Sequence, residues 1–172
     1  MSAPPNIFTA EGTLLAVGSN QPFWLTDRDS AWFIETGKVD LFTVPTVNGE
    51  PVGSRVHFLR VAAGQVLFAV AAAEQNSNLA FLAVGSSDAR VYKLPLARLK
   101  ELIRDPAGVE QLAAWIDQWV SGLYSGMCRG LPPQDFETLQ PEHEAALTSA
   151  QSAHPEQGVV WVTQAGGTTH LA

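Results

Sequence analysis

The sequence is poor in cysteine, in basic residues and in long apolar segments, and each shortage excludes a class of protein. Its 172 residues include a single cysteine, Cys128, which rules out an internal disulfide and a metal site built on several cysteines. Ten Lys and Arg stand against 17 Asp and Glu, and the net charge of -7 argues against binding to nucleic-acid phosphates. The longest apolar run, "VAAGQVLFAVAAA", is too short to cross a bilayer, which takes about 20 residues.

Large apolar side chains, in contrast, are plentiful. Hydrophobic residues make up 46% of the chain and include five Trp and eight Phe, which is enough to build the core of an ordinary globular domain. The N-terminus has no positive start and no apolar signal core, so the sequence favours a reducing, cytosolic setting. Pro4 and Pro5 predict a flexible lead-in over residues 1–10, and we expect residues 11–172 to form one domain.

Strand signals dominate the first half of the chain. The segments "AWFIE", "KVDLFTV", "SRVHFLRV", "QVLFAVA", "LAFLAVG" and "ARVYKL" are rich in β-branched and aromatic residues. Turn residues separate them, and Asn48-Gly49 is the strongest of these signals because both residues tolerate a positive φ. Many short strands at this spacing predict a roll, a sandwich or a barrel.

A helical pattern replaces the strand pattern at about residue 95. Leu96, Leu99 and Leu102 recur at helical spacing, and Asp105-Pro106 predicts an N-cap followed by the first residue of a longer helix. Apolar residues then return every three or four positions as far as Met127. We therefore expect a helical insert over about residues 95–130.

The end of the chain repeats part of the beginning. In "VVWVTQAGGTTHLA", Trp161 and Gly166 have the same spacing as Trp32 and Gly37. Two such hairpins, far apart in sequence, could close a roll, because a lone terminal hairpin would leave an open edge. The predicted fold is mainly β with inserted helices, a β-roll that its last hairpin completes.

Residue patterns that carry chemistry are sparse. The phosphate loop of an ATPase that used Gly37-Lys38 would need Gly in place of Trp32, and Ser or Thr after the lysine. His57 is the one histidine in a predicted strand, whereas a metal site needs about three converging ligands. Cys128 has no base near it in sequence, which favours an inert packing role. We predict no catalytic, cofactor-binding or metal-binding residue and no enzymatic activity.

The tryptophans admit two interpretations. Trp115 and Trp119 lie one helical turn apart, and Trp24 lies in an early β segment. These side chains either fill the core, as a helix face packed on the roll would, or form part of a docking surface, because interfaces favour Trp. Trp24, Trp115 and Trp119 are therefore our candidate partner-docking residues.

Two stretches carry a resemblance to a known family, "DSAWFIETGKVDLFTV" and "NGEPVGSRVHFLRVAAGQVLF". They are similar to the N-terminal cytosolic domain of bacterial ABC exporters associated with nitrile-hydratase-like leader peptides, the NHLP/NHLM type of bacteriocin export transporter. The "KLPLARL" segment and the terminal "VVWV" also resemble that family. The residues that match its pattern are Trp32, Gly37, Val39, Asp40, Leu41, Phe42, Gly49, Glu50, Pro51, His57, Leu59, Arg60, Val61, Gly64, Leu67 and Phe68.

The resemblance implies both a fold and a setting. In that family a cyclic-nucleotide-binding-like β-roll precedes the membrane and ATPase domains, so this chain would be part of a longer, ATP-hydrolysing peptide exporter. It would lie on the cytoplasmic side of the bacterial inner membrane, with no membrane span of its own. Its partners would be the transmembrane and ATPase domains and the leader peptide of the cargo, and the parent transporter would make it a homodimer.

The nucleotide pocket that such a fold implies is degenerate in this sequence. Sites of this kind hold the ribose with a Gly-Glu pair and neutralise the cyclic phosphate with an Arg, but here Gln65 follows Gly64 and the next loop has no Arg. Glu74 in that loop would repel the phosphate. Two hypotheses stay open: a regulatory or docking module whose roll is plugged by Phe, Leu and Trp, or a small-molecule or nucleotide sensor with an open, polar pocket.

Overall fold

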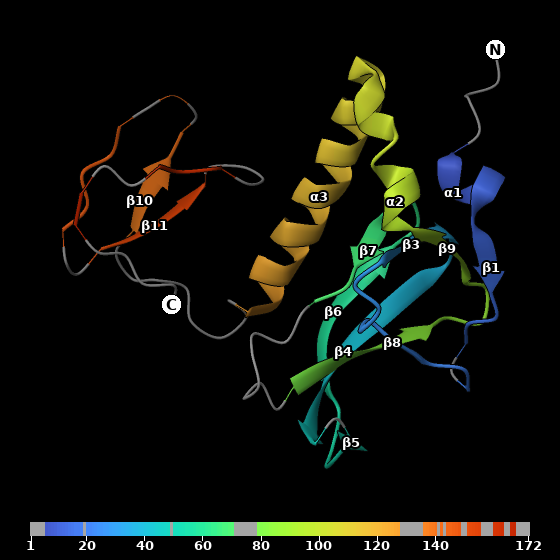
Figure 1. Ribbon diagram of the computed structural model, residues 1–172. Helices are drawn as coiled ribbons and strands as arrows, with labels where there is room; N and C mark the ends of the chain where they lie inside the picture. Colours follow the sequence, from blue (N-terminus) through green and yellow to red (C-terminus); the bar gives the residue numbers. More distant parts are fainter. Residues whose placement is uncertain are drawn as a thin grey trace. The chain divides into compact units, whose positions relative to one another are not determined.

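The chain divides into two compact units, Met1–Arg129 and Gly130–Ala172. Figure 1 shows the elements of each unit, and none of the described helices is long and apolar enough to cross a membrane. The computed structural model describes residues 6–18, 20–48, 50–70, 79–127, 136–140, 142, 144–148, 151–155, 160–163 and 166–167.

Two antiparallel sheets form the roll of the first unit. One has the strand order β1-β9-β3-β7, and the other has the order β2-β8-β4-β5, with β6 also paired to β4. The strands of the first sheet are β1 (Thr13–Leu15), β9 (Arg90–Pro95), β3 (Ser30–Thr36) and β7 (Val66–Phe68). Those of the second are β2 (Phe23–Trp24), β8 (Leu79–Gly85), β4 (Lys38–Val47), β5 (Glu50–Pro51) and β6 (Val56–Ala62).

The strands follow the sequence pattern closely. In β4, Val39 and Leu41 are fully buried, whereas the alternate residues Lys38 and Asp40 are not. Gly37 connects β3 to β4 with a φ of +74°, and a Cβ there would lie 2.7 Å from the Cα of Ala89. A glycine is therefore required at this turn for both its φ and its lack of a side chain. The predicted mainly-β roll is confirmed.

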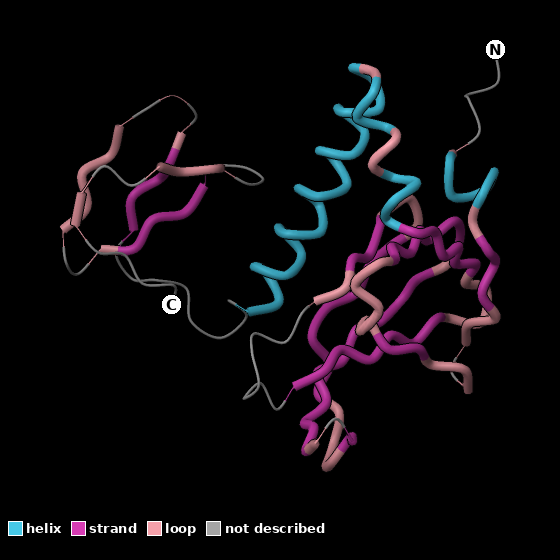
Figure 2. Tube along the Cα trace, in the orientation of Figure 1, coloured by secondary structure: helices cyan, strands magenta, loops and turns pink. Residues whose placement is uncertain are grey.

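Helices pack on the first sheet and also on β6 of the second. They are α1 (Ile7–Glu11), α2 (Leu96–Leu99), the 3-10 helix η1 (Leu102–Arg104) and α3 (Pro106–Met127), and Figure 2 distinguishes them in cyan from the strands in magenta. The carboxylate of Asp105 accepts a hydrogen bond of 2.9 Å from the backbone N–H of Gly108, so the predicted N-cap of the long helix is confirmed.

The lead-in predicted for residues 1–10 is wrong for residues 6–10. Asn6 caps α1 by accepting a hydrogen bond from the backbone of Phe8, and Phe8 is completely buried. Its ring stacks on Phe33 with the centroids 5.5 Å apart. Pro4 and Pro5 gave no sign of this helix, whose turn is stabilised by the burial of Phe8.

The prediction of a terminal hairpin is wrong at the residues that the structure describes. Val160–Thr163 form no strand, and the side chain of Trp161 is 80% exposed. The second unit instead has a parallel pair, β10 (Phe136–Leu139) with β11 (Ser152–Pro155). The strands of the roll all precede α2, and they already pair through β1 with β9 and β2 with β8, so the roll needs no late hairpin to close it.

Candidate functional site

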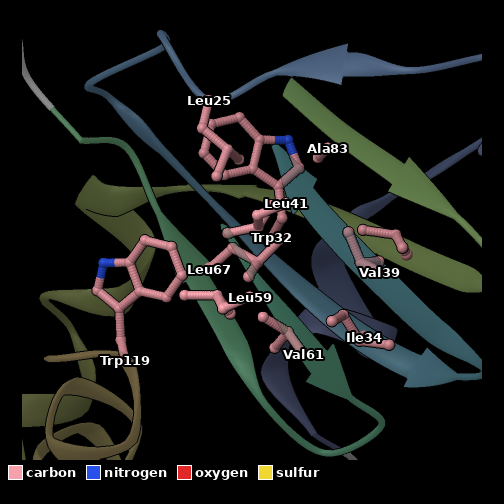
Figure 3. Packing of buried hydrophobic residues seen from close by; sticks show 11 residues of the cluster. Leu25, Trp32, Ile34, Val39, Leu41, Leu59, Val61, Leu67, Ala83 and Trp119 are labelled. Carbon is pink, nitrogen blue, oxygen red and sulfur yellow. The ribbon is translucent and has the colours of Figure 1, made fainter. Parts of the chain in front are cut away.

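The interior of the roll is where a ligand of this fold would be sought, and its own side chains fill it. Trp32 of β3 lies at the centre, 2% exposed, with the ring of Phe23 at 5.9 Å between centroids. Figure 3 shows Trp32 among the buried side chains of both sheets. The cluster comprises Leu25, Trp32, Ile34, Val39, Leu41, Leu59, Val61, Leu67, Ala83, Val91 and Trp119.

Strand β3 has apolar partners on both of its faces. Trp32 and Ile34 belong to the cluster inside the roll, whereas Ala31 and Phe33 belong to a second cluster with Phe8 and the helices. A strand covered on both sides explains the continuous apolar run "AWFI" in the sequence. Apolar side chains therefore pack against both faces of β3 in the middle of the domain.

Helix α3 places two of the candidate docking residues in these clusters. Trp119 is 7% exposed and extends toward Leu59 and Leu67, as Figure 3 shows, and Trp115 is 4% exposed with its ring 5.5 Å from that of Phe8. Both indoles are core groups, so the docking interpretation is wrong for Trp115 and Trp119 in this structure. Trp24, which is half-buried in β2, stays a prediction.

One small pocket remains between α3 and strands β6 and β7. It has a volume of about 50 Å³, and its lining includes Leu59 and Trp119, with Arg60, Gln65 and Gln118 as polar neighbours. Ligand pockets in proteins have volumes of about 300–1,000 Å³, so this space is far too small for a nucleotide and suits one or two water molecules.

The residues expected at the degenerate nucleotide site have structural partners. The side-chain oxygen of Gln65 accepts a hydrogen bond of 2.9 Å from the backbone N–H of Ala62, and the N–H of Gly64 donates to the carbonyl of Ile34 at 2.8 Å. These bonds form the turn between β6 and β7, in which Gly64 has a φ of +88°. Residues 71–78, with Glu74, lie outside the described residues.

Two basic side chains near the roll, Arg60 and Lys93, are paired with carboxylates. Arg60 donates two hydrogen bonds to Asp40, at 2.8 and 3.0 Å, and the Nζ of Lys93 lies 2.6 Å from a carboxylate oxygen of Asp27. The pKa of Asp40 is held below its usual value mainly by Arg60 and, to a smaller degree, by His57. Neither cation is free to neutralise a phosphate inside the roll.

A larger hollow belongs to the second unit. It measures about 360 Å³, and its lining includes Glu137, Thr138, Gln140 and Glu144. Two carboxylates would repel an anionic ligand such as a cyclic nucleotide. This hollow is therefore not a replacement for the nucleotide pocket.

Other chemistry has little support in the described part of the chain. No three His, Cys, Asp or Glu side chains there come close enough to hold a metal ion, and no buried side-chain polar atom there lacks a hydrogen-bond partner. His57 lies on the outer face of the roll, with its Nε2 3.1 Å from a carboxylate oxygen of Asp40. Cys128, His143 and His170 lie outside the described residues, as does the side chain of His154.

Comparison with solved structures assigns the fold to a class. No protein-family model and no curated protein sequence matches the chain. A CooA mutant from Carboxydothermus hydrogenoformans matches with a TM-score of 0.50 at 12% identity, over 74% of this chain and 78% of that one. The reduced CO-sensing protein from R. rubrum matches with a TM-score of 0.50 at 7% identity, over 72% and 52%. CprK complexed with OCPA matches with a TM-score of 0.50 at 14% identity, over 73% and 57%.

These likenesses show the fold and no more. The first unit has the fold of these structures, a cyclic-nucleotide-binding-like β-roll. The chain spans just over half the length of the last two structures named. Such folds carry many functions, so the function of this chain has to be argued from its own residues.

Proposed function

We propose that this chain is a non-catalytic regulatory or docking domain of a peptide-exporting ABC transporter, in which the β-roll has lost its nucleotide pocket. The observation that carries the proposal is the packed interior around Trp32; the pocket between α3 and strands β6 and β7 has a volume of about 50 Å³. The exporter setting comes from the sequence resemblance, which covers most of the chain and is most specific in its first half, between Trp32 and Phe68. The partners would be the transmembrane and ATPase domains of the exporter, the leader of its cargo and a second copy of the parent protein.

The energetics of the interior support a domain that works without a ligand there. A nucleotide of several hundred Å³ could enter only if a large side chain such as Trp32 or Trp119 moved out. Truncating a buried Trp costs about 3–5 kcal/mol, and exposing one has a comparable cost. Arg60, which lies in the strand next to the pocket, stays bound to Asp40 on the outer face, so the phosphate would gain no cation in return.

A small-molecule sensor is the second candidate. Gln65 and Gln118 line the remaining pocket, and amide groups there could orient a small polar ligand. Such a ligand would need contacts from residues that this pocket does not include, because about 50 Å³ holds little more than water.

Calorimetric titration of the purified chain distinguishes the two candidates. We expect no heat with cAMP, cGMP or cyclic dinucleotides, and saturable heat with a leader peptide of the exporter, with a scrambled leader as control. Micromolar nucleotide binding would make the domain a ligand sensor. If neither nucleotide nor leader gives heat, contact with the rest of the transporter is the role that remains, and co-purification with the transmembrane domains then tests it.

A further inference from the structure

A row of aromatic and apolar side chains crosses the outer face of the second sheet. The register pairs Trp24 of β2 with Leu82 of β8, Leu82 with Phe42 of β4, and Phe42 with His57 of β6. Directly paired residues of neighbouring strands point to the same side of a sheet. These four residues, which we call the outer row, therefore share one face although they come from four separate strands.

The outer row points away from the filled interior. Its neighbours in sequence, Leu41 and Ala83, are completely buried inside the roll, and successive residues of a strand point to opposite faces. Trp24, Leu82 and Phe42 are half-buried, and the side chain of His57 is 38% exposed. The described helices make their main contacts with β1, β3, β6, β7 and β9, so none of them packs mainly on the outer face of β2, β8 and β4.

Basic groups border one end of the outer row. The guanidinium of Arg55 lies over the ring of Phe42, 4.8 Å from its centroid, and makes no ion pair with any residue that the structure describes. Arg60 is paired across the strands with Asp40, two residues before Phe42 on β4, and 57% of its side chain is exposed. A chain with a net charge of -7 thus carries, beside its aromatic face, an arginine that has no carboxylate partner among the described residues.

We propose that the outer row and Arg55 form the docking surface for an acidic, amphipathic peptide segment. The inference deepens the proposed docking function and rests on it. Apolar side chains of the peptide would pack on Trp24, Leu82 and Phe42, and a carboxylate would pair with Arg55. Tryptophan and arginine are the residues that most often supply binding energy at interfaces.

Charge complementarity favours a peptide over the other occupants of such a face. Two copies of this chain that met in two-fold symmetry about the middle of the outer row would place Arg55 at the far end of the partner's row, and no residue of that row carries a carboxylate. An anionic membrane would oppose a chain of net charge -7 over a wide area. A short peptide interacts only with the local field, because salt screens charges beyond about 8–10 Å.

Two short synthetic peptides test the proposal by calorimetry on the full chain. One is an amphipathic peptide of Leu, Ala and Glu, and the other is the same peptide with each Glu replaced by Lys. We expect saturable binding of the Glu peptide alone, weakened by added salt. Trp24→Ala should lower the affinity about tenfold, and Arg55→Glu should lower it at least as much while leaving the buried core intact.

Matched controls separate the surface from general effects. Trp161→Ala removes a tryptophan that is 80% exposed in the second unit, and Arg104→Glu reverses an exposed arginine outside this face; both should change the affinity less than twofold. Equal binding of both peptides, or binding that Trp24→Ala and Arg55→Glu leave unchanged, would overturn the docking surface. So would a dimer in sedimentation that Trp24→Ala dissociates, or binding to phosphatidylglycerol vesicles but not to the Glu peptide.

Failure of this surface and failure of the proposed function give different results. If a leader peptide binds with equal affinity to the wild type and to Trp24→Ala, the docking function stands and the outer row is not its site. If cyclic nucleotides bind at micromolar concentration, the proposed function itself is wrong, whatever the two peptides do.

Discussion

The two faces of strand β4 differ in what they offer to another molecule. Val39 and Leu41 on the inner face are fully buried in the cluster around Trp32. Asp40 and Phe42, on the outer face, pack against side chains that are themselves partly exposed to solvent. Among the described residues the inner face is packed with apolar side chains, and the outer face carries aromatic and basic groups. The docking surface that we propose is therefore on the outside of the sheet.

The largest effect should come from emptying the interior. We expect Trp32→Ala to lower the free energy of unfolding by about 3–5 kcal/mol, because it leaves a cavity in the centre of the domain. Urea denaturation monitored by circular dichroism measures this loss. Trp24→Ala, on the outer face, is the matched variant and should cost less than half as much. Equal losses for the two variants would contradict the distinction between the two faces.

The turn that joins the two sheets should be the next most sensitive position. Gly37→Ala would place an alanine at a φ of +74° with its Cβ 2.7 Å from the backbone of Ala89. We therefore expect the free energy of unfolding to fall by about 2–3 kcal/mol. Gly53 has a φ of +81° with open space around it, so Gly53→Ala isolates the cost of the dihedral angle, about 1 kcal/mol. Thermal unfolding of both variants compares them, and a smaller loss for Gly37→Ala would refute the steric argument.

The N-cap of α3 should matter less, although this helix holds Trp119 against the roll. Asp105→Ala removes the hydrogen bond to the backbone of Gly108 and should cost about 0.5–2 kcal/mol. Glu110 is exposed in the same helix, and Glu110→Ala should change the free energy of unfolding by no more than about 0.5 kcal/mol. Urea denaturation provides the comparison, and an unchanged stability in Asp105→Ala would show that packing alone positions the helix.

The smallest effect concerns the ion pair beside the outer row. Arg60 lowers the pKa of Asp40 in the folded state, so this carboxylate stabilises the fold above its unfolded pKa of about 3.9. The contribution is lost as the pH falls through the lower, folded pKa. We expect the free energy of unfolding of the wild type to exceed that of Asp40→Asn by up to about 1 kcal/mol at pH 7 and by less below pH 4. Urea denaturation at the two pH values measures this difference. A difference that grows on acidification would have the wrong sign.

Local signals in the sequence predicted much of the fold. The turns at Gly37 and Asn48, the alternation within β4 and the cap at Asp105 depend on residues close together in the chain. The short helix at Phe8 was missed because distant residues stabilise it. The strand predicted around Trp161 failed because a spacing shared with another hairpin does not specify a pairing partner.

The candidate site was harder to predict, for a related reason. Helical periodicity showed that Trp115 and Trp119 share a face but not that strands of the roll cover it. The outer row could not be seen at all, because Trp24, Phe42 and Leu82 become neighbours only through the register of strands far apart in sequence.

A nuclear magnetic resonance titration that follows the indole N–H signals tests the central claim most directly, because tryptophans report on both faces. The account predicts that cAMP at millimolar concentration leaves the signals of Trp32 and Trp119 unchanged, and that the acidic amphipathic peptide shifts the signal of Trp24 and not that of Trp32. A saturable shift of Trp32 and Trp119 at micromolar cAMP would show that the interior opens to a nucleotide, and would contradict the account.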